Sequence, residues 1–71
     1  ALKECLADVA EHGMVRHEAA EALGALGAEA AVPALKAGCS DRDPVVSQSC
    51  VVALDVLAHE RSGAFEYAAG A

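Results

Sequence analysis

The stretch Met14–Gly27, MVRHEAAEALGALG, decides the fold of this chain. Its apolar residues recur at the spacing of a helix, and the glycine at its end is typical of a helix terminus. A second copy follows at an offset of 31 residues, so that Ala22-Leu23 aligns with Ala53-Leu54. The shared apolar positions are Val15, Ala19, Ala22, Leu23 and Leu26 in the first copy, and Val46, Cys50, Ala53, Leu54 and Leu57 in the second. We expect both sets to form buried stripes, because both satisfy the helical period in the same register.

The two copies differ at one adjacent pair of residues. His17 and Glu18 of the first copy are replaced by Gln48 and Ser49 in the second. Packing therefore does not require a histidine and a glutamate here, and the pair is a candidate for chemistry. Adjacent residues of a helix project about 100° apart. We accordingly expect His17 to face the open surface of the fold, with Glu18 to its side.

An imidazole nitrogen and a carboxylate oxygen together suit iron, manganese or zinc. Two ligands are not a complete site, because such metals take about four to six. A His-Glu pair on a helix is more often simply solvated, and His59-Glu60 is interpreted in that way. His12 is interpreted as a helix-end residue, and Glu21 as a further negative charge on the same exposed surface as His17.

The remaining helices follow from the same period and from turn residues. Leu2, Cys5, Leu6 and Val9 predict a first helix that ends near Glu11. A third helix is expected over residues 29–38, with Pro33 in or near its first turn. A fourth is expected over residues 45–59, after Asp43 as N-cap and Pro44 as first helical residue.

These helices predict an all-α fold, an α-solenoid of HEAT-like repeats made of two antiparallel helix pairs and a C-terminal tail. The first repeat is expected over residues 1–27, the second over 28–59, and the tail over 60–71. Because repeat arrays usually need about three or more units, we expect the chain to be a piece of a longer solenoid.

The fourth helix is apolar on nearly every side, which indicates burial on more than one side. Its additional apolar residues are Val45, Val51, Val52 and Val56. The sequence leaves three candidates for what covers these residues: the tail, which carries Phe65 and Tyr67, a missing domain, or a second chain.

The composition limits the classes of partner that the chain is expected to bind. The net charge is −6, which disfavours nucleic acid and anionic lipid, because both bind through Lys and Arg. A basic partner or a cationic substrate fits better, although an acidic surface also serves solubility alone. The sequence has no apolar run of membrane-spanning length and no signal peptide pattern. Three cysteines without paired spacing, Cys5, Cys39 and Cys50, favour reduced thiols and a cytoplasmic location.

The run MVRHEAAEALGALG, the run RDPVVSQSCVVALDVL and the tail SGAFEYA together resemble the C-terminal end of the deoxyhypusine hydroxylase family. The resemblance covers nearly the whole chain. Its most specific part is VRHEAAEALG, which is preceded by Glu11.

This resemblance implies a HEAT-repeat monooxygenase in which four His-Glu motifs, two in each half, hold a non-haem di-iron centre. The substrate implied is deoxyhypusine, a modified lysine, on the precursor of translation initiation factor 5A. By position, His17 and Glu18 match the last motif and are the implied iron ligands, while Met14 and Gly24 fall near the implied substrate channel. The other motifs lie outside these residues, so the piece is expected to need the remainder of the parent solenoid and to be inactive alone.

The alternative is a non-catalytic HEAT-repeat scaffold that binds a protein partner. Further His-Glu helices encoded upstream of Ala1 would favour the enzyme, and plain repeats would favour the scaffold.

Overall fold

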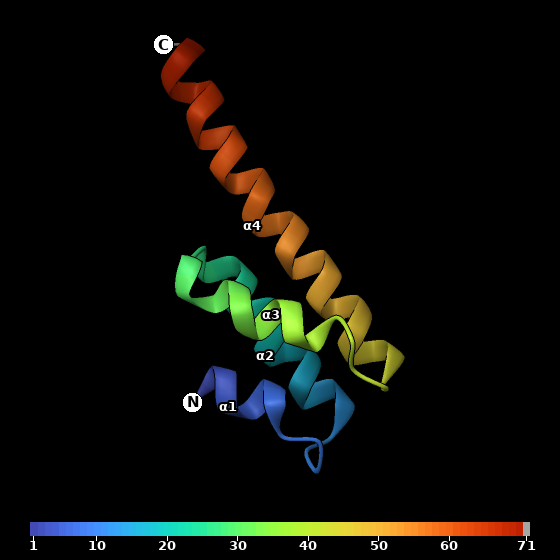
Figure 1. The fold of residues 1–71 in the computed structure, drawn as a ribbon. Coiled ribbons are helices and arrows are strands. Elements are labelled where there is room, and N and C mark those ends of the chain that lie inside the picture. Colours follow the sequence, from blue (N-terminus) through green and yellow to red (C-terminus); the bar gives the residue numbers. More distant parts are fainter. Residues whose placement is uncertain (71) are drawn as a thin grey trace.

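The computed structural model describes the backbone of residues 1–70 and the side chains of residues 1–59. Within that range the chain forms helices and no strand: α1 (Leu2–Ala7), α2 (Gly13–Leu26), the 3-10 turn η1 (Glu29–Ala31), α3 (Val32–Gly38) and α4 (Pro44–Gly70). The chain reverses direction between successive α-helices, which makes α1–α2 and α3–α4 antiparallel pairs (Figure 1). The prediction of an all-α fold with two antiparallel helix pairs is confirmed.

The helix ends that the sequence predicted are formed by the expected capping residues. Gly27 ends α2 with a φ of 65°, in the left-handed region that glycine adopts without a steric penalty. The Asp43 carboxylate accepts a hydrogen bond from the Val45 backbone N–H at 3.0 Å, and Pro44 is the first residue of α4. His12 is the N-cap of α2, where its Nδ1 accepts from the Met14 N–H at 3.2 Å. It is therefore a helix-end residue, as expected.

The prediction that the first helix reaches Glu11 is wrong, because α1 ends at Ala7. The carboxylate of Asp8 accepts a hydrogen bond from the Ala10 N–H at 3.0 Å, which offers the backbone a turn in place of a further helical turn. Val9 lies in that turn and is 81% exposed, so it is not part of the buried stripe.

The buried face of α2 also differs from the prediction. Ala19 and Leu23 are buried as expected, but Val15 and Leu26 are exposed and Ala22 is only half-buried. The residues of α2 that are buried are Arg16, Ala19, Ala20, Leu23 and Gly24. At about 100° per residue, this face is rotated around the helix by roughly 80° from the predicted stripe.

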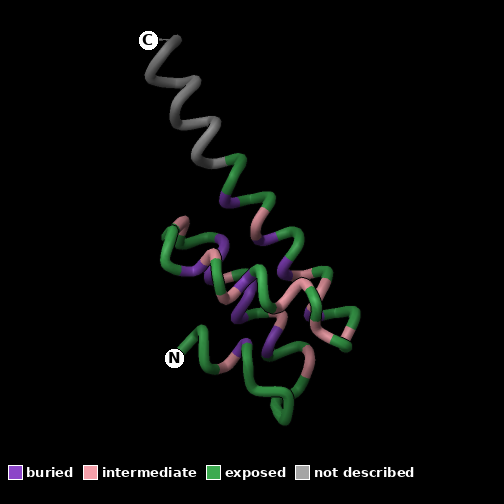
Figure 2. The backbone as a smooth tube through the Cα atoms, viewed as in Figure 1, coloured by how far each residue is buried: buried purple, intermediate pink, exposed green. Residues whose placement is uncertain are grey.

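Four of the five residues in the second copy of the stripe are buried as predicted. Val46, Cys50, Ala53 and Leu57 are buried in α4, and Leu54 packs against the core as a half-buried residue. α4 has its most extensive contacts with α2 and also packs on α3. In α4 this stripe is buried against the preceding helices, whereas at the same positions of α2 only Ala19 and Leu23 are buried; Figure 2 colours the backbone by burial.

α4 continues to Gly70, beyond residue 59 where the sequence predicted its end. It extends past the other helices in Figure 1, so residues 60–70 do not fold back as the tail that was one candidate cover for the valines. The side chains of Phe65 and Tyr67 lie outside the described residues. The valines that the sequence singled out on this helix are exposed: Val45, Val51, Val52 and Val56.

A buried arginine ties the two helix pairs together. Arg16 Nε donates to the Leu6 carbonyl at 2.9 Å, near the end of α1, and its other nitrogens bind both carboxylate oxygens of Asp41. The hydrogen bond to Asp41 raises the pKa of Arg16 and lowers the pKa of Asp41. A bidentate pair of this kind fixes the loop before α4 relative to α1 and α2.

No helix within the described residues is both long and apolar enough to cross a membrane.

Candidate functional site

An apolar groove of about 590 Å³ lies between α2 and α4. From α2 it is lined by His17, Glu21, Gly24 and Ala25, and from α4 by Pro44, Val45, Gln48, Ser49, Val52, Ala53 and Val56. The register of the two helices creates this groove, because small residues on both sides let the backbones approach closely. A Cβ placed on Gly24 would lie 2.9 Å from the Cβ of Ala53 and 3.0 Å from its Cα.

His17 stands at the polar end of the groove and joins the two helices. Its Nδ1 is hydrogen bonded to the Oγ of Ser49 on α4, and its Nε2 lies 3.1 Å from a carboxylate oxygen of Glu21, one turn along α2. The Ser49 hydroxyl also donates to the Val45 carbonyl within α4. His17 is 34% exposed, so it does not face the open surface as predicted but lies at the edge of an interhelical groove.

The two ring nitrogens of His17 therefore have different surroundings. Nδ1 is hydrogen bonded to a half-buried hydroxyl on the neighbouring helix, whereas Nε2 lies beside a carboxylate that is 73% exposed. The contact of His17 with Glu21 is an ion pair when the ring is protonated. A cation placed at Nε2 would replace that proton and remain next to the Glu21 carboxylate.

Of the other predicted site residues, Gly24 lines the groove, whereas Met14 and Glu18 do not. Glu18 is exposed, because it projects about 100° away from His17 around the helix. Among the described residues, no hydrogen bond or ion pair holds its carboxylate. The structure therefore brings His17 together with Glu21 and Ser49 and leaves Glu18 free to turn.

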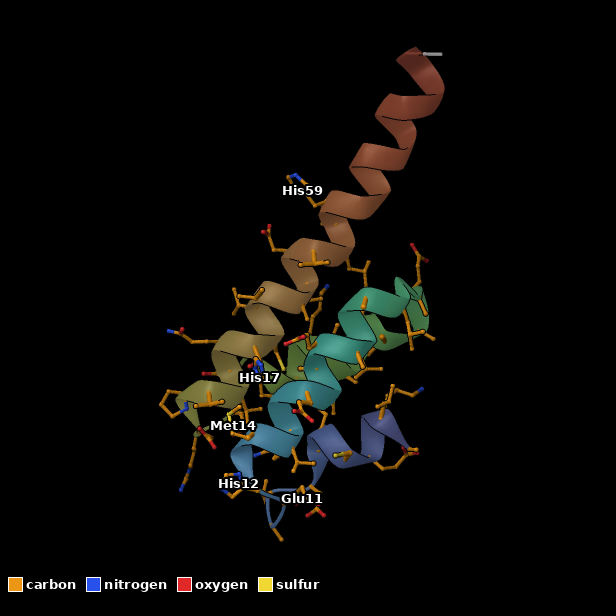
Figure 3. All side chains as sticks on the ribbon, turned by 180° about the vertical axis from the view of Figure 1, so that it is seen from behind. Glu11, His12, Met14, His17 and His59 are labelled. Atoms are coloured by element: carbon orange, nitrogen blue, oxygen red, sulfur yellow. The ribbon has the colours of Figure 1, made fainter. Side chains whose placement is uncertain are left out.

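The remaining histidines lie away from this site. In Figure 3 His12 and Glu11 are at the turn before α2, and His59 is much farther along α4. The Glu11 carboxylate accepts from the His12 N–H at 2.9 Å, so it serves the helix start.

The donor chemistry around His17 fits a metal such as iron, because an imidazole nitrogen and carboxylate oxygens are suitable ligands. The set is incomplete among the residues whose side chains are described. No group of three or more His, Cys, Asp or Glu side chains that could hold a metal occurs among the described residues. Any metal at His17 would need further ligands from outside those residues.

Sequence reasoning missed Ser49, and it identified the apolar valines of α4 without placing Val45, Val52 and Val56 in a groove beside His17. Glu21 had a detectable signal, because residues four apart on a helix are neighbours. Ser49 had none within its own helix, since its contact with His17 depends on how the two copies of the repeat stack.

Comparisons with known proteins agree with this architecture. The sequence profile of HEAT repeats matches residues 1–61. The chain is 53% identical over 68 residues to deoxyhypusine hydroxylase-B of Oryza sativa subsp. japonica, covering 94% of this chain and 22% of that protein. It is 51% identical over 69 residues to the deoxyhypusine hydroxylase of Homo sapiens, covering 97% of this chain and 23% of that protein.

The structure of human deoxyhypusine hydroxylase in complex with glycerol superposes with a TM-score of 0.80 at 50% identity, over 82% of this chain and 20% of that chain. The resemblance found in the sequence is thus confirmed, and so is the predicted solenoid of HEAT-like repeats. The chain spans about a fifth of the length of these relatives.

Proposed function

The chain belongs to the HEAT-repeat family, and we propose that it is a segment of a deoxyhypusine hydroxylase to which it contributes part of the metal site. The observation that carries the proposal is His17, which matches a histidine expected from the resemblance and lines a groove with its Nε2 beside a carboxylate. Identity of about 50% over nearly the whole chain supports the same parent.

In this proposal His17 and Glu18 are the two iron ligands that this segment supplies. Nε2 of His17 would bind the ion through its lone pair, and the Glu18 carboxylate would reach the same ion by rotating from its exposed position. Bound iron, completed as a di-iron centre by residues outside this chain, would supply the redox chemistry that hydroxylation with dioxygen requires. The parent would act in the cytoplasm on the deoxyhypusine side chain of the precursor of translation initiation factor 5A.

The groove residues suit a long cationic side chain. Val45, Val52 and Val56 provide an apolar wall for methylene groups, and Glu21 provides a negative charge at the end nearest His17. Gly24 lines the groove opposite this wall, which supports a substrate role at that position, and the substrate role of Met14, in the first turn of α2, rests on the resemblance.

The experiment uses the full-length protein that contains this segment. His17→Ala should remove iron and hydroxylation together, and Glu18→Gln should weaken iron binding. His59→Ala is the matched control, because this histidine is exposed on α4 and lies outside the groove. Retention of the full iron content after replacement of His17 would refute the assignment.

A second candidate, a non-catalytic scaffold, is favoured by one observation. The exposed valines of α4 form an apolar surface of a kind that monomers seldom leave open. Purified full-length protein that binds no iron but captures a partner through this surface would support the scaffold and contradict the hydroxylase.

A further inference from the structure

We propose that Ser49 is a positioning residue for His17: its hydroxyl holds the proton on Nδ1 and so leaves the Nε2 lone pair free for a metal. This inference rests on the proposed function, in which His17 is an iron ligand. It assigns a role to the copy of the repeat that lacks the His-Glu pair, because Ser49 occupies in that copy the position of Glu18.

The direction of the hydrogen bond between Ser49 and His17 follows because a hydroxyl has only one proton to donate. Ser49 has one O–H, and that proton is donated to the Val45 carbonyl four residues earlier in α4. The carbonyl cannot donate in return. The Ser49 oxygen therefore presents its lone pairs to His17, and the ring must donate from Nδ1.

A neutral imidazole carries a proton on only one of its two nitrogens, so this bond selects the tautomer. With Nδ1 protonated, Nε2 keeps its lone pair, and it lies beside Glu21 at the edge of the groove that both residues line. Metal-binding histidines generally show this arrangement, in which the nitrogen away from the metal donates to an oxygen that fixes the tautomer and the ring orientation.

The competing interaction is the one between Nε2 and Glu21, which favours a proton on Nε2. Glu21 is 73% exposed and belongs to the same helix as His17, so water screens this contact and its contribution is small. Ser49 is half-buried between two helices and its own proton is already used. The interaction with Ser49 therefore determines the tautomer of the neutral ring.

The variants that test this role change one hydroxyl at a time in the full-length protein. Ser49→Ala removes the acceptor. Ser49→Thr keeps it, and threonine can also donate to a carbonyl four residues earlier in a helix. Ser47→Ala is the matched control, because Ser47 also bonds a carbonyl of α4, that of Pro44 at 3.3 Å, but lies outside the groove.

The first measurement is the tautomer of His17 in metal-free protein labelled with 15N-histidine. It is made at about pH 8.5, above the ordinary histidine pKa of about 6.5, with the signal assigned by its loss in His17→Ala. We expect the Nδ1–H tautomer in the parent, Ser49→Thr and Ser47→Ala, and a shift toward Nε2–H in Ser49→Ala. The second measurement is iron affinity, which should fall about 10- to 100-fold in Ser49→Ala only.

The outcomes separate the two proposals. If Ser49→Ala keeps the parent tautomer and the parent iron affinity while His17→Ala loses iron, the positioning role is wrong and the ligand assignment stands. If His17→Ala keeps its iron, the ligand assignment itself is wrong, and the positioning role is overturned with it.

Discussion

Leu26 and Leu57 occupy the same position in the two copies of the repeat, 31 residues apart, and yet their surroundings are opposite. Leu26 is 68% exposed at the end of α2, whereas Leu57 is 3% exposed in the core. Truncation of each leucine to alanine is therefore a matched pair of perturbations. The substitution is the same at both positions, and leucine and alanine both have high helix propensity, so the difference between the variants reports mainly burial.

The expected magnitudes differ widely. Leu57→Ala removes buried methyl groups and should lower the free energy of unfolding by about 2–5 kcal/mol, whereas Leu26→Ala should change it by less than about 0.5 kcal/mol. For a domain of this size, each kcal/mol shifts Tm by about 4–8 °C. Even the lower limit for Leu57→Ala thus predicts a fall in Tm of about 8–16 °C.

The assay is thermal and urea unfolding of the 71-residue chain, followed by circular dichroism at the helical minimum. Equal losses of stability in the two variants would refute the assignment of faces, because they would mean that Leu26 is also buried. A larger loss for Leu26→Ala would do so more strongly.

Other parts of the fold give further predictions. Gly24→Ala should destabilise the chain by about 1–3 kcal/mol in urea unfolding, since the added Cβ meets Ala53 at 2.9 Å; a stabilised variant would contradict this close approach. Arg16 holds the pKa of Asp41 below its ordinary value of 3.8, so this pair contributes stability above that pH and loses it as pH falls further. The urea midpoint should then fall less steeply in acid for Asp41→Asn than for the parent. The same pH dependence in both proteins would contradict a stabilising role of this pair. Burial raises the pKa of the Cys50 thiol, so mass spectrometry after alkylation should find it protected until urea unfolds the chain, unlike the two half-exposed cysteines.

The helix content was predictable because it depends on local signals. The apolar period and the capping residues Gly27 and Asp43 act within a few residues, and each produced the helix end that it predicted. The same reasoning failed at Asp8, where a local side-chain bond to the backbone competed with the helix. The apolar pattern continued through Val9, and one carboxylate was enough to override it.

The buried face of α2 was not predictable from the pattern that the two copies share. A helix in a stacked array packs against one neighbour before it and another after it, so it has two apolar faces. The shared stripe is the face that α4 turns toward the preceding helix pair. α2 has the same stripe, but its buried face also includes Arg16, Ala20 and Gly24, and Gly24 is the residue that lies close to Ala53 of α4.

The same stacking explains why the residues that surround His17 were not predicted from the sequence. Comparing the copies treats Ser49 as the residue that replaces Glu18, and thus as evidence that the second copy lacks chemistry. In a solenoid, however, successive copies are also neighbours in space. Residues separated by about one repeat meet across the groove, as His17 and Ser49 do. The site around His17 is therefore formed by residues of both copies, and the copy that lacks the His-Glu pair contributes Ser49.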